Sequence, residues 1–166
     1  AARLVVHAEG TPGNDAGVRV YDYRQHAVVA EVRPLAGHGH RAWERFTPDG
    51  PVALLPLAQA YSVVFTMPPE KAGQFIELDE QAFLAALRIQ FGSRMDFVAS
   101  GPRASFPLAL RVRQQLTVPR QVWIGNAAQS LHPVSGQGFN LGLRDAWELA
   151  ETLLTRASGD AGDAAG

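Results

Sequence analysis

The chain of 166 residues contains no cysteine. This absence excludes disulfide bonds, thiolate metal sites and cysteine nucleophiles, and it fits a reducing compartment such as the cytoplasm. Any redox chemistry must then come from a bound cofactor.

An excess of charge of one sign is also lacking, because 15 Lys and Arg residues stand against 16 Asp and Glu residues. With a formal net charge of −1 and no basic block, no nucleic-acid partner is expected. No apolar run approaches the ~20 residues that a membrane-spanning helix needs. The length allows one medium domain to bury a hydrophobic core without disulfides or metals.

The N-terminus reads as a strand that is already under way. Residues 3–7 (Arg-Leu-Val-Val-His) follow two alanines, with neither an initiator methionine nor the design of a signal peptide. We therefore expect a piece that starts inside a longer protein.

Apolar and β-branched runs separated by short turns fill the first two-thirds of the chain, which predicts a mostly antiparallel sheet. The turn Pro48–Pro51 predicts a hairpin, and Pro68-Pro69 is expected to continue neither a strand nor a helix. The predicted strands are 3–7, 23–32, 41–47, 52–57, 61–67, two segments of 97–112 broken at Gly101-Pro102, and 121–124 after a turn at 117–120.

Two helices are predicted. Residues 79–90 form the first, with Asp79 as its N-cap and Phe83 and Leu87 on one face, and it should be the one helix that covers the sheet. The second follows Gly138. Its apolar face consists of Leu143, Ala146, Leu149, Ala150, Leu153 and Leu154, and its polar face of Arg144, Asp145, Glu148 and Glu151.

A glycine-rich stretch connects the strand at 121–124 to this second helix. Glycine lets a flat ligand approach the backbone, and the free amides of a helix N-terminus favour negative charge. The junction therefore predicts a site for a phosphate, a carboxylate or an electron-rich heterocycle; the alternative is a tight turn with close packing. Leu141 stands where a dinucleotide fingerprint needs glycine, and no Gly-Lys-Ser/Thr of a P-loop follows.

Residues 125–145, GNAAQSLHPVSGQGFNLGLRD, resemble the second flavin-binding motif of the FAD-dependent aromatic hydroxylases, the p-hydroxybenzoate-hydroxylase-like family. Within that family they are most similar to the ubiquinone-biosynthesis branch. Residues 45–57 and Phe106-Pro107-Leu108 also resemble this branch, so the similarity extends from about Tyr23 to Leu154.

The resemblance implies a set of FAD-binding residues. Asn126 replaces the aspartate that usually holds the ribityl hydroxyls, Pro133 should lie near the flavin ring, and the N–H groups of 136–140 should face the pyrimidine edge of the isoalloxazine. The implied set is Gly125, Asn126, Pro133, Gly136, Gln137, Gly138, Phe139 and Asn140. No acid, base or nucleophile of the oxygen transfer is assigned, so the catalytic residues are unknown.

The resemblance also implies an α+β fold: the mostly antiparallel sheet of a substrate domain, plus a strand and long helix of the flavin domain. The expected parts are 1–15 (the end of a flavin-domain segment), 16–115 (substrate-binding sheet), 116–157 (flavin-domain strand, loop and helix) and 158–166 (a flexible tail). Two departures stand out. Ala8-Glu9-Gly10 lacks the Ser and Arg of the family's other motif, and no Gly-x-Gly-x-x-Gly unit is present, so we expect a C-terminal fragment.

The implied activity is FAD-dependent hydroxylation of an aromatic ring, a polyprenyl phenol in ubiquinone biosynthesis, with NADPH and O₂ as co-substrates. The expected location is the cytoplasm, with peripheral association at the inner membrane or with a ubiquinone-biosynthesis complex. The alternative is a non-catalytic binding or assembly module, a fragment unable to hold FAD alone.

Other candidate residues have plainer interpretations. Histidines 7, 26, 38, 40 and 132 lack the spacing of metal ligands and are expected at the surface. Ser130 and Ser135 near His132 could suggest a hydrolase, but no Gly-x-Ser-x-Gly elbow is present. Four aromatic residues could line a substrate pocket, although core packing is favoured for each: Trp43, Phe46, Phe65 and Phe106.

Overall fold

The computed structural model describes residues 2–13, 15–133 and 136–155. These residues form two compact units: unit 2 is the middle of the chain, 24–108, and unit 1 is formed by the segments on either side of it. Two 17-residue strands, β2 (Val18–Pro34) and β6 (Phe97–Arg113), contribute to both units. The tail expected at 158–166 lies outside the described residues.

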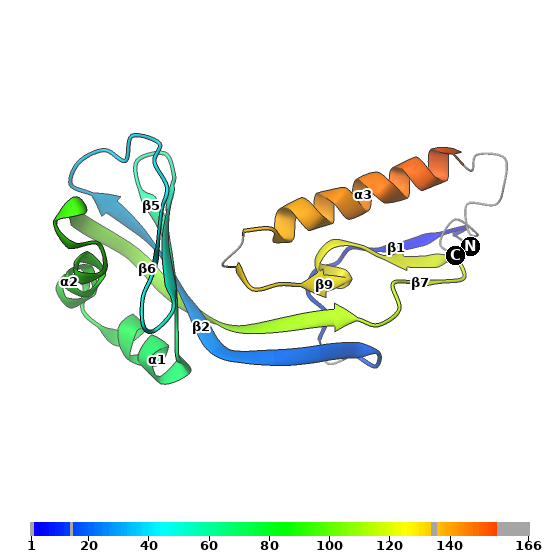
Figure 1. Ribbon diagram of the computed structural model, residues 1–166, viewed down its shortest axis with the longest axis horizontal. Helices are drawn as coiled ribbons and strands as arrows, with labels where there is room; N and C mark the ends of the chain where they lie inside the picture. The colour runs from blue at the N-terminus through cyan, green and yellow to red at the C-terminus, as the bar shows by residue number, and fades with distance from the viewer. Residues whose placement is uncertain (1, 14, 134–135, 156–166) are drawn as a thin grey trace. The chain divides into compact units, whose positions relative to one another are not determined.

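An antiparallel sheet forms the centre of unit 2, as predicted (Figure 1). Its further strands are β3 (Trp43–Phe46), β4 (Pro51–Pro56) and β5 (Tyr61–Met67). The hairpin predicted at Pro48–Pro51 joins β3 to β4, and the strand order is β3-β4-β5-β2-β6 with β9 beyond. The pairing of Val28 with Phe65 and of Val52 with Phe65 sets alternate side chains on one face.

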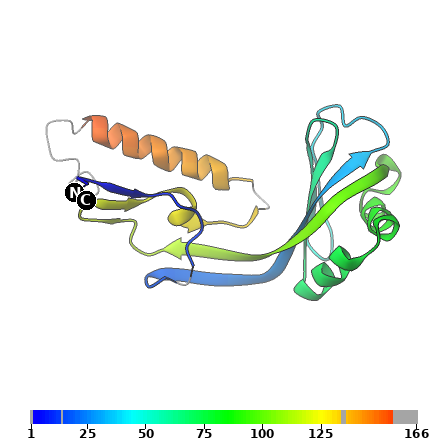
Figure 2. The ribbon, with the colours of Figure 1, turned by 180° about the vertical axis from the view of Figure 1, so that it is seen from behind.

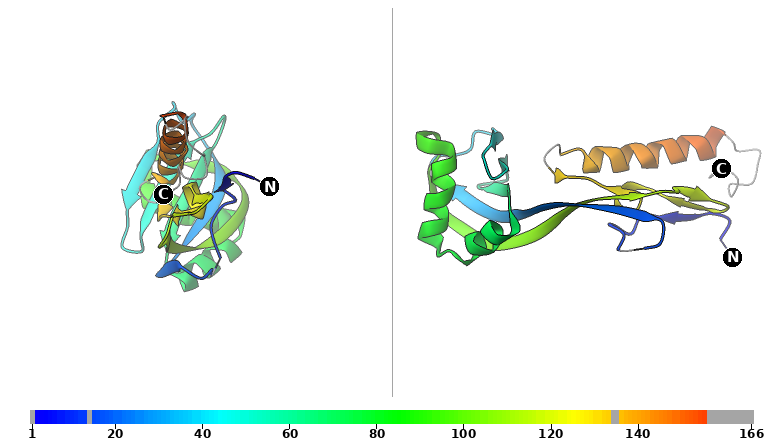
Figure 3. Two further views of the ribbon diagram at one scale, coloured as in Figure 1. Left: turned by 90° about the vertical axis from the view of Figure 1, so that its right-hand side faces the viewer. Right: turned by 60° about the horizontal axis from the view of Figure 1, so that its bottom comes forward.

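Helices cover that face of the sheet (Figure 3). They are α1 (Pro69–Glu77) and α2 (Glu80–Phe91), followed by the short 3₁₀ helix η1 (Gly92–Arg94). Asp79 caps α2 as predicted, because its side chain accepts a hydrogen bond from the Ala82 amide at 2.8 Å. The core includes Val28, Val32, Val52, Leu54, Tyr61, Val63, Phe65, Phe83 and Leu87.

Two predictions for unit 2 were wrong. Helix α1 was not expected, because the pair Pro68-Pro69 was expected to continue neither a strand nor a helix. Pro69, however, is the first residue of α1, where the missing N–H would have no helical partner. The sheet therefore has two covering helices rather than one. The break at Gly101-Pro102 is also absent, since β6 runs through it. Within unit 2, β6 is the edge strand of the described sheet, and proline is tolerated at an edge.

Unit 1 contains a three-stranded sheet (Figure 2). Strand β8 (Gln121–Trp123) pairs in parallel with β1 (Val5–His7) and antiparallel with β7 (Thr117–Val118). Because β7 takes up the first two residues of the turn predicted at 117–120, that turn is shorter than expected. The 3₁₀ helix η2 (Gly125–Ala127), strand β9 (Gln129–Ser130) and helix α3 (Gly138–Thr155) follow. The α+β class is confirmed. Across the described ranges, no helix is both long and apolar enough to cross a bilayer.

Candidate functional site

The chain turns sharply where β8 ends. The Ile124 amide donates the last bond of the β1–β8 pairing to the His7 carbonyl at 3.0 Å. Gly125 then adopts φ +58°, a left-handed conformation that side chains other than glycine rarely take. Its carbonyl accepts from the Ala128 amide at 3.0 Å, which closes η2. A glycine is therefore required at the first position of the glycine-rich stretch.

Helix α3 holds this turn from the other side. The Gly125 amide donates to Asp145 Oδ2 at 2.9 Å. A Cβ placed on Gly142 would lie 3.3 Å from the Gly125 Cα, closer than most Cβ contacts. Asp145, predicted on the polar face of the helix, is thus half-buried and bound to the loop. The predicted pair of Arg144 with Glu148 is present at 3.5 Å.

Arg113 of β6 supports the same segment. Its amide donates to the Ala128 carbonyl at 2.9 Å, and its Nε donates to the Ala127 carbonyl at 3.4 Å. Its guanidinium lies 4.7 Å from the centre of the Trp123 ring and 3.2 Å from Asp15. Only 14% of this side chain is exposed, and its contacts connect Trp123 of β8 to the turn at 127–128.

A cavity of about 690 Å³ lies between the turn and the start of α3. Six of the eight predicted site residues line it: Gly125, Asn126, Pro133, Gly136, Gly138 and Phe139. Gln137 and Asn140 do not. The sequence analysis missed the other lining residues, which are Ser130, Leu131, His132, Gly142, Leu143 and Ala146.

The glycines leave room in front of their backbone. A Cβ built on Gly136 or Gly138 would meet no atom within 4 Å. Gly136 has φ +60°, and its amide donates to the Pro133 carbonyl at 3.0 Å. Because α3 begins at Gly138, its first amides have no carbonyl partner inside the helix. The cavity wall therefore combines an accessible backbone, helix-start dipoles and apolar side chains.

His132 is the titratable side chain of the cavity wall. It is half-buried rather than at the surface, and its ring meets that of Tyr23 edge to face, with centroids 4.9 Å apart. Burial removes water from the imidazole and lowers its pKa below the ordinary value. His7, His26 and His38 are likewise partly buried, so the surface prediction holds for His40 alone. In the sequence, the position of His132 beside Pro133 was the one available signal that His132 lines the cavity.

The apolar face of α3 is less covered than the sequence predicted. No residue of α3 is fully buried, and Phe139, Leu143, Trp147 and Leu154 are exposed. In unit 2, Phe65 belongs to the core and Trp43 packs partly against it, whereas Phe46 and Phe106 are exposed. Core packing is thus confirmed for Phe65. Among the residues that the structure describes, no cluster of His, Asp and Glu could hold a metal.

Comparisons with known proteins show which family this chain belongs to. The family model described as "FAD binding domain" matches residues 2–165. Ubiquinone hydroxylase UbiL of Rhodospirillum rubrum is 37% identical over 160 residues, which cover 92% of this chain and 37% of that protein. The 3-demethoxyubiquinol 3-hydroxylase of Escherichia coli is 33% identical over 163 residues, 95% of this chain and 42% of that protein.

More distant relatives and solved structures extend the similarity. Human COQ6, a ubiquinone biosynthesis monooxygenase, is 31% identical, with 89% of this chain and 41% of that protein covered. The probable FAD-dependent monooxygenase pqsL of Pseudomonas aeruginosa has a TM-score of 0.75 at 22% identity. The match covers 98% of this chain and 49% of the pqsL chain.

The flavin-dependent halogenase CmlS has a TM-score of 0.70 at 22% identity, and the match covers 98% of this chain and 32% of the CmlS chain. These two structures share the fold. The chain spans about two-fifths of the length of the curated relatives named above. With a family model that matches nearly every residue, this chain belongs to the FAD binding domain family.

Proposed function

We propose that this chain is part of a FAD-dependent monooxygenase that hydroxylates the ring of a polyprenyl phenol in ubiquinone biosynthesis. The observation that supports this most is the 690 Å³ cavity at the start of α3, in a chain of the FAD binding domain family. FAD, when bound, supplies the redox chemistry that activates O₂.

The residues of this cavity fit a flavin. Its volume lies within the range of ~300–1,000 Å³ that is usual for ligand sites. A flat ring needs close access to the backbone, and the space in front of Gly136 and Gly138 is open. Leu131 and Pro133 supply apolar wall, while the helix start supplies dipoles for the polar edge of the ring.

Each predicted residue has a proposed task. The Asn126 side chain is exposed at the cavity and would accept a hydrogen bond from a ribityl hydroxyl through its amide oxygen. The amides of 136–140 would orient the pyrimidine edge and stabilise negative charge on it. Gln137 and Asn140 do not line the cavity, so their backbone would carry this role. Pro133 and Phe139 would flank the ring.

His132 would keep the cavity free of an added positive charge. Because burial lowers its pKa, the imidazole favours its neutral form at pH 7. In that form one ring nitrogen donates a hydrogen bond and the other accepts one. Charge stabilisation would then come from the oriented amides rather than from an ion. Asp145 and Gly142 would act as positioning residues, since they fix the turn at Gly125.

The relatives' names suggest the substrate class. We propose a prenylated phenol, with O₂ and NADPH as co-substrates and with peripheral contact to the inner membrane or to a ubiquinone-biosynthesis complex. A strain that lacks the gene for this chain should accumulate a prenylated phenol one ring hydroxyl short, detected by mass spectrometry. Unchanged quinone content would contradict the substrate.

The cofactor is tested separately. FAD titrated into the purified chain should show quenched flavin fluorescence and a shifted absorbance band. Gly37→Val is the control for the substitution of a glycine at the FAD cavity. Gly37 is in a loop of unit 2 where a Cβ meets no atom within 4 Å, so this variant should bind FAD as the parent does. A chain that does not bind FAD would instead support a non-catalytic binding or assembly module.

A further inference from the structure

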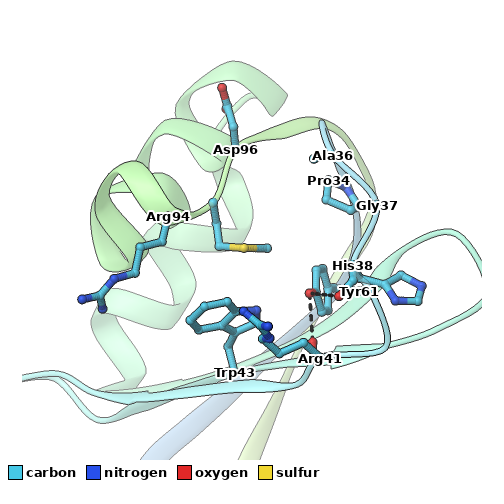
Figure 4. Close-up of a pocket in the computed structure, with 11 residues that line it drawn as sticks. Pro34, Ala36, Gly37, His38, Arg41, Trp43, Tyr61, Arg94 and Asp96 are labelled. Carbon is cyan, nitrogen blue, oxygen red and sulfur yellow. Dashed lines mark hydrogen bonds between the residues drawn. The ribbon is translucent and has the colours of Figure 1, made fainter.

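A second cavity, separate from the residues assigned to FAD, lies within unit 2 (Figure 4). It has a volume of about 320 Å³ and is formed by the loop after β2, the start of β3, and the segment after η1. We call it the Arg41 cavity. It is lined by Pro34, Ala36, Gly37, His38, Gly39, Arg41, Trp43, Tyr61, Arg94, Met95 and Asp96.

We propose that the Arg41 cavity binds a small aromatic carboxylate. The flat wall for the ring is Trp43, and the Arg41 guanidinium lies 5.6 Å from the centre of its indole. Figure 4 shows the two side chains next to each other at one side of the cavity. A guanidinium beside an aromatic ring keeps its N–H groups in its own plane, where a carboxylate can accept two of them.

Charge in the cavity favours one anionic group. Among the described residues, no carboxylate forms an ion pair with Arg41. Asp96 is the acid in the lining, and its side chain is already bound by Arg88. The Arg94 guanidinium points away from Trp43 and Tyr61 (Figure 4). One available guanidinium inside the cavity suits a carboxylate better than a doubly charged phosphate, which usually takes more donors.

Hydrogen bonds from the Tyr61 hydroxyl fix the backbone of the loop that carries Arg41. Tyr61 is buried, and its hydroxyl donates to the Arg41 carbonyl at 2.9 Å, with the His38 carbonyl at 3.4 Å. His38 Nδ1 accepts from the His40 amide at 3.0 Å, so its proton is on Nε2, which faces the Ala58 carbonyl at 3.3 Å.

The backbone of this loop is also unusual. Gly39 and His40 have φ of +55° and +56°, and a left-handed histidine persists only where its surroundings impose it. The loop thus fixes the Arg41 backbone before any ligand arrives, which lowers the part of the entropy cost of binding that comes from ordering the loop. The volume, at the low end for ligand sites, suits one ring without a prenyl chain.

The test uses benzoate as the probe, measured by isothermal titration with the full 166-residue chain. Benzoate should bind, and Arg41→Gln should weaken it by about tenfold or more, because a charge-assisted hydrogen-bond pair is lost. Arg33→Gln, an equal loss of charge on β2 outside this cavity, should leave binding unchanged. Ala36→Asp adds a negative charge at an exposed lining residue and should also weaken benzoate.

Two further probes define the ligand class. Benzamide, which has the ring without the charge, should bind at least about tenfold more weakly than benzoate. Inorganic phosphate should not displace benzoate. The proposal is overturned if benzoate fails to bind at millimolar concentration, if Arg41→Gln binds it as the parent does, or if phosphate displaces it. FAD titration of the same variants separates this result from the proposed function, since FAD affinity should not change.

Discussion

The Gly125 amide donates a hydrogen bond to Asp145 Oδ2 at 2.9 Å, which joins the turn after β8 to helix α3. The two lie twenty positions apart in the sequence, and described residues between them line the larger of the two cavities. The position of the helix start relative to the turn therefore depends on this bond and on the contact between Gly142 and Gly125.

Removal of the acceptor should loosen the turn. Asp145→Ala leaves the half-buried Gly125 amide without its partner, and we expect a loss of about 1–2 kcal/mol in the free energy of unfolding. Urea denaturation measures it. Glu148→Ala, which breaks the exposed pair with Arg144, should cost about 0.5 kcal/mol or less. Equal losses in the two variants would mean that the Asp145 bond adds no stability.

The close approach of Gly142 to Gly125 predicts an unusual response to alanine. In α1, a Cβ on Gly73 meets no atom within 4 Å, so Gly73→Ala should stabilise the protein by up to about 1 kcal/mol through helix propensity. Gly142→Ala should gain little or lose stability, because its Cβ would be 3.3 Å from the Gly125 Cα. Thermal melts of the two variants decide this, and a matching gain at both positions would argue against a tight contact.

A larger side chain at the start of α3 should affect the cofactor more than the fold. Gly138→Val fills open space in front of the backbone, where no protein atom lies within 4 Å. We expect soluble yield close to that of the parent and FAD affinity lower by about tenfold or more, roughly 1.4 kcal/mol or more. Flavin fluorescence titration measures the affinity. If yield and affinity fall together, the glycine serves packing instead.

The lowered pKa of His132 makes stability depend on pH. Below the ordinary histidine pKa of about 6.5, the unfolded chain binds a proton at this position more readily than the native chain does, and this lowers the free energy of the unfolded state relative to the native one. Stability should fall as the pH drops from 6.5 toward the lower native pKa. Comparison of urea midpoints at pH 7.5 and 5.5 should show a smaller decrease in His132→Asn than in the parent.

His26→Asn provides the comparison for this pH experiment. His26 is also half-buried, but its Nδ1 bonds to Ser105 Oγ at 2.9 Å rather than lying at the cavity. The difference between the two midpoints in this variant is the reference for the loss of a half-buried imidazole outside the cavity. A parent-like pH dependence in His132→Asn would show that desolvation of this ring does not carry the effect.

Local signals in the sequence predicted much of the fold correctly. Strand β5 was predicted with its observed bounds because β-branched and aromatic residues end there at Pro68. Asp79 predicted the start of α2 correctly, because an N-cap side chain bonds to an amide only a few residues further along the chain. Helix α1 was missed, since a proline pair signals a stop and a first helical turn equally well.

The motif in residues 125–145, through its resemblance to a flavin-binding motif, predicted eight residues at one ligand site, and six of them line one cavity. That local information was sufficient because glycine content, proline and a helix start act within a few residues of one another. The inward turn of Asp145, the burial of His132 and the assembly of the Arg41 cavity were decided by tertiary structure alone. Each depends on groups brought together from distant positions, such as Tyr23 beside His132 and Tyr61 beneath the Arg41 loop. No local pattern encodes such contacts, because they form only when strands far apart in the chain pair and pack.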